Sequence, residues 1–124
     1  MPQETAHEAP PMRFRPALIL AGTAAPLALA GFHFFAYAAT PWICLRQALP
    51  LLWVGSAAAI VLAASGLAAG LAISMRRVEE REDAPGPAPR GAFMGSVLAL
   101  FSALILLVLI DQAAATLLID PCQK

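Results

Sequence analysis

Three long runs of hydrophobic residues, separated by short polar segments, dominate the pattern along this chain. Asp, Glu, Lys and Arg do not occur between Ala17 and Ile43 or between Gln47 and Met75, and Gly91 to Ile119 contains only Asp111. About 20 apolar residues cross the ~30 Å hydrocarbon core of a bilayer, and each run is longer than that. The pattern therefore predicts an all-α membrane protein with three transmembrane helices, at about 17–39, 48–75 and 91–119.

The remaining segments are polar, and we expect them to lie outside the bilayer. Residues 1–16 contain several prolines and predict a flexible tail before a transmembrane domain over 17–119. In the loop 76–90, the charged stretch RRVEERED is expected to extend the second helix into water, and APGPAP is typical of a stiff linker. Residues 120–124 form a short C-terminal tail.

The placement of basic residues predicts the orientation of the chain. The N-terminal tail and the 76–90 loop carry six arginines, namely Arg13, Arg15, Arg76, Arg77, Arg81 and Arg90. The opposite side has only Arg46 and Lys124. Because basic residues concentrate in cytoplasmic loops, we expect the N-terminus and the loop in the cytoplasm and the C-terminus on the outer side.

The composition agrees with this pattern and narrows the classes of function. Hydrophobic residues make up 60% of the chain and charged residues 13%, with a formal net charge of zero. Soluble domains have about 45–50% apolar and about 25% charged residues. The zero net charge gives no electrostatic argument for binding nucleic acid. We expect the lipid bilayer and a larger membrane protein complex as partners, with no nucleic acid and no small-molecule substrate.

Both cysteines of the chain follow a predicted helix on the same side of the membrane. Cys44 comes after the first helix and Cys122 after the third. Disulfides persist in oxidising compartments such as the bacterial periplasm, whereas cytosolic thiols stay reduced. We therefore predict a Cys44–Cys122 disulfide, with two unpaired thiols as the alternative.

A histidine and an aspartate interrupt the hydrophobic runs at matching positions. His33 lies eleven positions before Cys44, and Asp111 lies eleven positions before Cys122. The first and third helices are parallel, so both residues should lie at a similar depth in the outer half of the membrane. Ionisable residues inside a membrane usually face the bundle interior and pair. We predict a His33–Asp111 pair, and the alternative is that one or both face a partner subunit.

The other polar residues nearby suggest a small cluster and no catalytic site. Tyr37 lies one turn from His33, and Gln112 follows Asp111, so both are candidates to support the pair. Zinc needs three or four ligands, and these residues do not supply them. No Gly-rich phosphate loop, G-x-S-x-G, HExxH or CxxC motif occurs in the sequence. We therefore expect no enzyme activity and no catalytic, cofactor-binding or metal-binding residues.

Two glycine pairs have the GxxxG spacing of helix-packing motifs. Gly66 and Gly70 lie in a segment of mostly small residues, and Gly91 and Gly95 open the third helix. Small residues let transmembrane helices approach closely, because lipid provides no hydrophobic drive between them. The second helix is predicted to be either the central helix of the bundle or a docking face for another protein.

The first helix resembles a known group of proteins. Residues 27–46, LALAGFHFFAYAATPWICLR, resemble the opening of small three-helix proteins encoded beside haem–copper terminal oxidases in proteobacteria. The residues that carry the resemblance are His33-Phe34, Tyr37, Cys44, Arg46 and Pro121-Cys122. Asp111 is not part of the pattern. The resemblance implies a bacterial inner (cytoplasmic) membrane and an association with an oxidase, and it implies no mechanism.

The sequence is compatible with three functions. The leading hypothesis is a non-catalytic accessory or assembly subunit of a larger respiratory complex, namely a cytochrome c or quinol terminal oxidase. An alternative is a self-assembled membrane protein that conducts protons or ions through His33 and Asp111. A third hypothesis is a small subunit of a photosynthetic or other redox complex in the membrane.

Overall fold

Three helices make up almost all of the described chain. A computed structural model describes residues 16–82, 90–119 and 122, with α1 over Pro16–Arg46, α2 over Pro50–Glu82 and α3 over Arg90–Leu118. Each helix is long and apolar enough to cross a membrane, so the chain is consistent with a multi-pass membrane protein. The predicted all-α class with three helices long enough to span a membrane is confirmed. The predicted tail before Pro16 and the linker at 83–89 lie outside the described residues.

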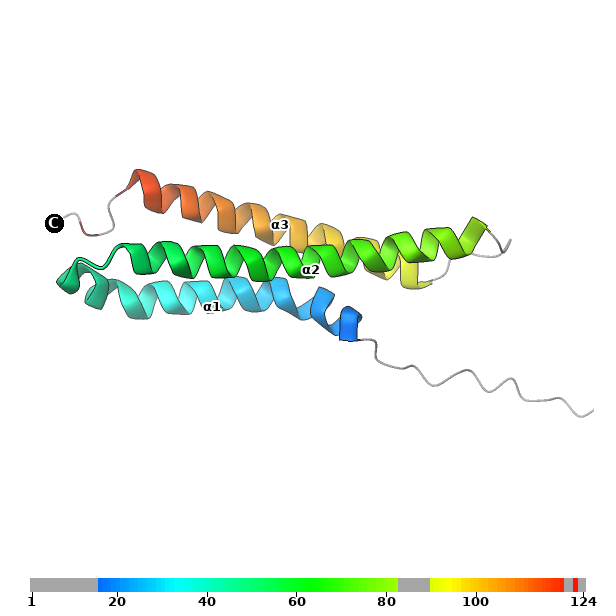
Figure 1. The fold of residues 1–124 in the computed structure, drawn as a ribbon, viewed down its shortest axis with the longest axis horizontal. Helices are drawn as coiled ribbons and strands as arrows, with labels where there is room; N and C mark the ends of the chain where they lie inside the picture. Colours follow the sequence, from blue (N-terminus) through cyan, green and yellow to red (C-terminus); the bar gives the residue numbers. More distant parts are fainter. Residues whose placement is uncertain (1–15, 83–89, 120–121, 123–124) are drawn as a thin grey trace, which may run out of the picture.

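The helices lie side by side, and α2 is the central one. Figure 1 shows α1 and α3 running in the same direction, with α2 antiparallel between them. α2 packs extensively on both neighbours, whereas α1 and α3 contact each other much less. Of the two roles predicted for the second helix, the central position in the bundle is therefore confirmed.

α1 is longer than the sequence predicted. We expected the helix to end at about Ala39, because Thr40 and Pro41 follow, but it contains Pro26 and Pro41 and ends at Arg46. A proline removes one backbone hydrogen bond from a helix. Pro41 therefore costs α1 one hydrogen bond, and the helix continues through it to Arg46.

The end of α1 has the geometry of a Schellman motif. Gln47 has a φ of 57°, in the left-handed region that side chains rarely adopt. The Ala48 N–H donates a hydrogen bond to the Ile43 carbonyl at 3.1 Å. This bond satisfies a carbonyl that the helix end would leave free. The chain then turns back, and α2 begins at Pro50, where a missing N–H costs nothing.

Small side chains dominate the core where the three helices meet. The core cluster consists of Ala25, Ala28, Phe32, Ala59, Ala63, Ile105 and Leu109. Gly66 of α2 faces both neighbours, because a Cβ there would lie 3.2 Å from the Ala24 Cβ and 3.5 Å from the Ser102 hydroxyl oxygen. Gly66 therefore lies at a close contact of α2 with both neighbours.

The closest approach of α2 and α3 depends on two further glycines. A Cβ on Gly70 would lie 2.9 Å from the backbone nitrogen of Ala99. A Cβ on Gly95 would lie 3.0 Å from the backbone nitrogen of Ser74 and 3.2 Å from the Gly70 carbonyl oxygen. Both glycines therefore lie where α2 and α3 approach each other closely. Gly91 lies outside the residues whose surroundings the structure describes.

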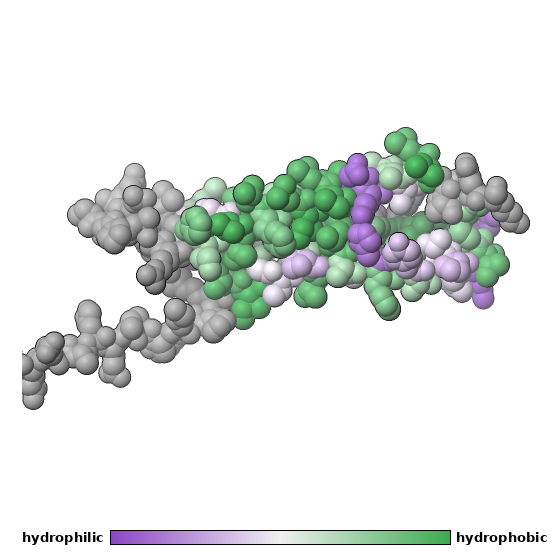
Figure 2. Space-filling model, turned by 180° about the vertical axis from the view of Figure 1, so that it is seen from behind, coloured by the Kyte–Doolittle hydropathy of each residue, from purple (hydrophilic) through white to green (hydrophobic). Residues whose placement is uncertain are grey.

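Most of the surface of each span faces outward. The most hydrophobic windows of α1, α2 and α3 are only 28%, 22% and 28% buried inside the bundle. The outer surface is largely hydrophobic, with a narrow hydrophilic band crossing it (Figure 2). Lipid or a partner protein must therefore cover most of the three helices.

Candidate functional site: polar contacts between α1 and α3

A cysteine pair joins α1 and α3 at one end of the bundle. The Sγ atoms of Cys44 and Cys122 are 2.07 Å apart, and their Cα atoms are 5.5 Å apart. Both values fit a disulfide. Cys44 lies in the last turn of α1, and Cys122 follows the end of α3. The two predicted partners therefore lie at disulfide distance.

His33 contacts a partner through each of its ring nitrogens. Its Nδ1 lies 3.0 Å from the carbonyl oxygen of Leu29, one turn earlier in α1. Its Nε2 lies 3.1 Å from the side-chain amide nitrogen of Gln112 in α3. Because the carbonyl only accepts, Nδ1 donates to Leu29, and Nε2 accepts an N–H from Gln112. A neutral imidazole with its proton on Nδ1 fits both contacts and ties α1 to α3.

The partner of His33 is Gln112 and not Asp111. Within residues 16–82 and 90–119, His33 and Asp111 form no hydrogen bond or ion pair with each other. Asp111 is exposed. The predicted His33–Asp111 pair is therefore wrong, and Gln112, which we expected only to support that pair, takes its place.

Helix geometry explains why the neighbouring positions differ. Ser102, Ile105 and Leu109 are buried and recur every three or four residues, so they mark the inner face of α3. Gln112 continues this spacing. Asp111 lies about 160° around the helix from Leu109, at ~100° per residue, and therefore on the outer side.

Tyr37 does not take part in the polar contact. Its side chain is 82% exposed, and it forms no hydrogen bond with the described residues, so its predicted supporting role is wrong. Trp42 and Trp53 are also about half exposed, and Arg46 lies over the Trp42 ring at 5.4 Å. Exposed Tyr and Trp near helix ends are typical of the aromatic belt at a membrane interface.

A second polar contact between α1 and α3 was not predicted. The Ser102 hydroxyl is fully buried and donates a hydrogen bond to the Ala21 carbonyl at 3.5 Å. One feature of the sequence points to this contact, because Ser102 shares the helical spacing of Ile105, Leu109 and Gln112. Together, Ser102 and Gln112 place two polar groups of α3 against α1.

The Gln112 amide is only half satisfied within the chain. Its Oε1 atom is buried and accepts no hydrogen bond from the described residues. A buried acceptor without a donor is unfavourable. The contact with His33 therefore satisfies the nitrogen end of this amide and leaves the oxygen end as an unused acceptor.

The His33–Gln112 contact lies well inside the membrane span. α1 is continuous from His33 to Cys44, so the eleven residues between them correspond to ~16 Å at ~1.5 Å per residue. We expected Pro41 to shorten this distance, which was wrong for α1 because the helix continues through it. His33 therefore lies ~16 Å along α1 from the disulfide end of the bundle.

The arrangement supports hydrogen bonding between helices more than any reaction. Among the described residues, no three His, Cys, Asp or Glu side chains gather so as to hold a metal ion. Comparison with protein-family models, with curated proteins and with solved structures finds no significant match to this chain. The function must therefore be inferred from the geometry and the sequence.

We expect His33→Leu and Gln112→Leu each to lower the unfolding temperature in detergent, because each leaves the other polar group without its partner. Hydrogen bonds between transmembrane helices contribute ~0.6 kcal/mol on average and up to ~1.7 kcal/mol. The double variant should lose less stability than the sum of the two losses. The matched control combines His33→Leu with Asp111→Leu. In this double variant, the change in stability should equal the sum of the changes in the two single variants. Coupling between His33 and Asp111 would contradict the assignment of Gln112.

Proposed function

We propose that the chain is a non-catalytic accessory or assembly subunit of a larger respiratory complex in a bacterial inner membrane. The complex that we propose is a haem–copper terminal oxidase. The observation that carries the subunit role is a shallow groove on the outer face of α2, whose lining includes the small residues Ala57, Ala58 and Ser65.

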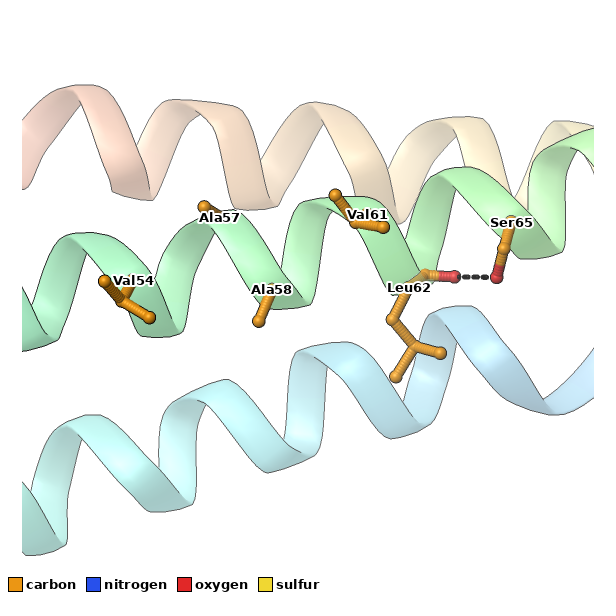
Figure 3. A pocket seen from close by; sticks show the side chains of 6 residues that line it. All are labelled: Val54, Ala57, Ala58, Val61, Leu62 and Ser65. Carbon is orange, nitrogen blue, oxygen red and sulfur yellow. Dashed lines mark hydrogen bonds between the residues drawn. The ribbon is translucent and has the colours of Figure 1, made fainter.

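This groove is lined by one face of α2 alone. Its residues are Val54, Ala57, Ala58, Val61, Leu62 and Ser65 (Figure 3). The Ser65 hydroxyl donates to the Leu62 carbonyl at 2.6 Å, so the one polar side chain is satisfied by its own helix. Small residues on an exposed transmembrane face let a second helix approach closely, because they keep the backbone near the surface. The groove therefore supports a partner helix on α2.

The choice of an oxidase rests on the resemblance of residues 27–46 to proteins encoded beside terminal oxidases. The cysteines that belong to this resemblance, Cys44 and Cys122, lie at disulfide distance. Such a bond needs an oxidising compartment, which supports placing this end of the bundle in the periplasm. The arginines at the other end support a cytoplasmic N-terminus.

The proposal predicts the outcome of a purification. The tagged chain, extracted from its native membranes in mild detergent, should carry subunits of a larger respiratory complex that peptide mass spectrometry identifies. The same tag on an unrelated three-helix membrane protein is the control. A chain that purifies alone would contradict the subunit role. Proton flux in liposomes of the purified chain, abolished by Asp111→Asn, would instead favour the conducting alternative.

A further inference from the structure

Asp111 presents a carboxylate on the outer side of α3, inside the hydrophobic span. Its side chain is exposed, and α3 continues past it to Leu118. The seven residues from Asp111 to Leu118 correspond to ~10 Å of helix, so the carboxylate does not lie at the helix end. Leu117, Leu118 and Ile119, which follow it, are exposed hydrophobic residues suited to lipid.

A carboxylate in this position needs a partner that the described part of the chain does not provide. Within residues 16–82 and 90–119, Asp111 makes no hydrogen bond or ion pair. Ionisable residues inside a membrane are unfavourable against lipid, and they usually face a protein interior or pair with another group. His33 is held by Leu29 and Gln112, so it is not the missing group.

The surface around Asp111 combines hydrophobic and hydrophilic side chains. In the hydrophobic runs 17–43 and 91–119, the strongly hydrophilic residues are His33, Asp111 and Gln112, and His33 is exposed as well. Figure 2 shows a narrow hydrophilic band across a largely hydrophobic face of the molecule. Leu104 and Leu107 lie on the same face of α3 as Asp111, and they are 56% and 64% exposed.

We infer that this face of α3 binds a transmembrane helix of a different protein that carries an arginine or lysine at the depth of Asp111. The inference rests on the proposed subunit role and adds the contact and its chemistry. An ionised carboxylate only accepts hydrogen bonds, so the partner must bring donors. A cationic donor forms the strongest such bond and neutralises the charge.

A second copy of this chain does not have the required chemistry. Lys and Arg are absent from its three hydrophobic runs. Two copies joined through this face would bring two Asp111 carboxylates together, and like charges repel. Charge complementarity therefore points to a different protein.

Site-specific photo-cross-linking tests the contact. A photoreactive residue replaces Leu107, one turn from Asp111 on the same face, and the matched control replaces Leu27 of α1, which is also 64% exposed. Position 107 should cross-link to a transmembrane segment that contains an arginine or lysine, and position 27 should not. Cross-linking of position 107 to a second copy of the chain would overturn the inference.

The same samples separate this inference from the proposed function. If a respiratory complex co-purifies but position 107 does not cross-link to it, the contact is wrong and the subunit role stands. If nothing co-purifies, the subunit role itself fails.

Variants of Asp111 test the chemistry of the contact. Asp111→Asn should reduce the amount of co-purified partner several-fold, and Asp111→Glu should keep most of it, because only the second keeps the charge. Replacing the cross-linked basic residue with Asp should restore binding to Asp111→Arg. The unfolding temperature of the isolated chain should be similar for all three variants, since Asp111 has no partner among the described residues. An unchanged yield of partner with Asp111→Asn would overturn the inference.

Discussion

Gly70→Leu should lower the unfolding temperature of the bundle in detergent far more than a surface substitution does. A Cβ at this position would lie 2.9 Å from the Ala99 nitrogen and 3.1 Å from the Ala99 Cα. These are backbone atoms, so they can move away only if α2 and α3 separate. Overpacking of a well-packed contact costs about 1–3 kcal/mol, and occasionally more.

Gly31→Leu is the matched control for this substitution. Gly31 is exposed in α1, and no heavy atom lies within 4 Å of a Cβ placed there. Circular dichroism of the purified variants during heating would give both unfolding temperatures. Similar unfolding temperatures for the two variants would show that α2 and α3 do not approach each other at Gly70.

Cys44→Ser should also destabilise the folded chain, because it removes the link between α1 and α3. The two cysteines are 78 residues apart in sequence, so the bond restricts a long segment of the unfolded chain. The chain-entropy model gives roughly 4 kcal/mol for a loop of this size in water. We expect a smaller loss in a membrane, where the helices of the unfolded state are already restricted.

The double variant Cys44→Ser/Cys122→Ser is the control. It shows whether a serine changes the stability by itself, apart from the loss of the bond. Its unfolding temperature should equal that of each single variant, because all three lack the same bond. Alkylation before lysis measures the state of the thiols in the cell. Alkylation of both thiols in the wild-type chain would contradict the disulfide.

The number and positions of the helices could be predicted because the membrane imposes simple rules. A segment without charged residues and longer than about 20 residues has few stable alternatives to a spanning helix. The end of α1 was misjudged at Pro41, since proline usually ends helices in water.

Gly66, Gly70 and Gly95 were recognised by their spacing. Gly55 was missed because its close contact is with the Phe35 ring of α1, which no local pattern reveals.

The polar contact could be predicted only in part. The approach of His33 to α3 followed from the spacing to the cysteines. The choice between Asp111 and Gln112 depends on which side of α3 faces α1, and Leu104, Leu106 and Leu107 make that helix apolar on all sides. A helix of this kind gives no amphipathic pattern from which its inner face could be determined. The inner face became evident only from the burial of Ser102 and Leu109.

The mass of the protein in the particle extracted in mild detergent, without the mass of the bound detergent, decides whether the chain acts with a different membrane protein. The chain alone has a mass of 13.0 kDa. Association with a larger complex predicts a heavier particle whose mass is not a multiple of that value and that still contains the chain. A particle of 13.0 kDa, or of a whole multiple of it, would contradict both the subunit role and the binding of another protein at Asp111.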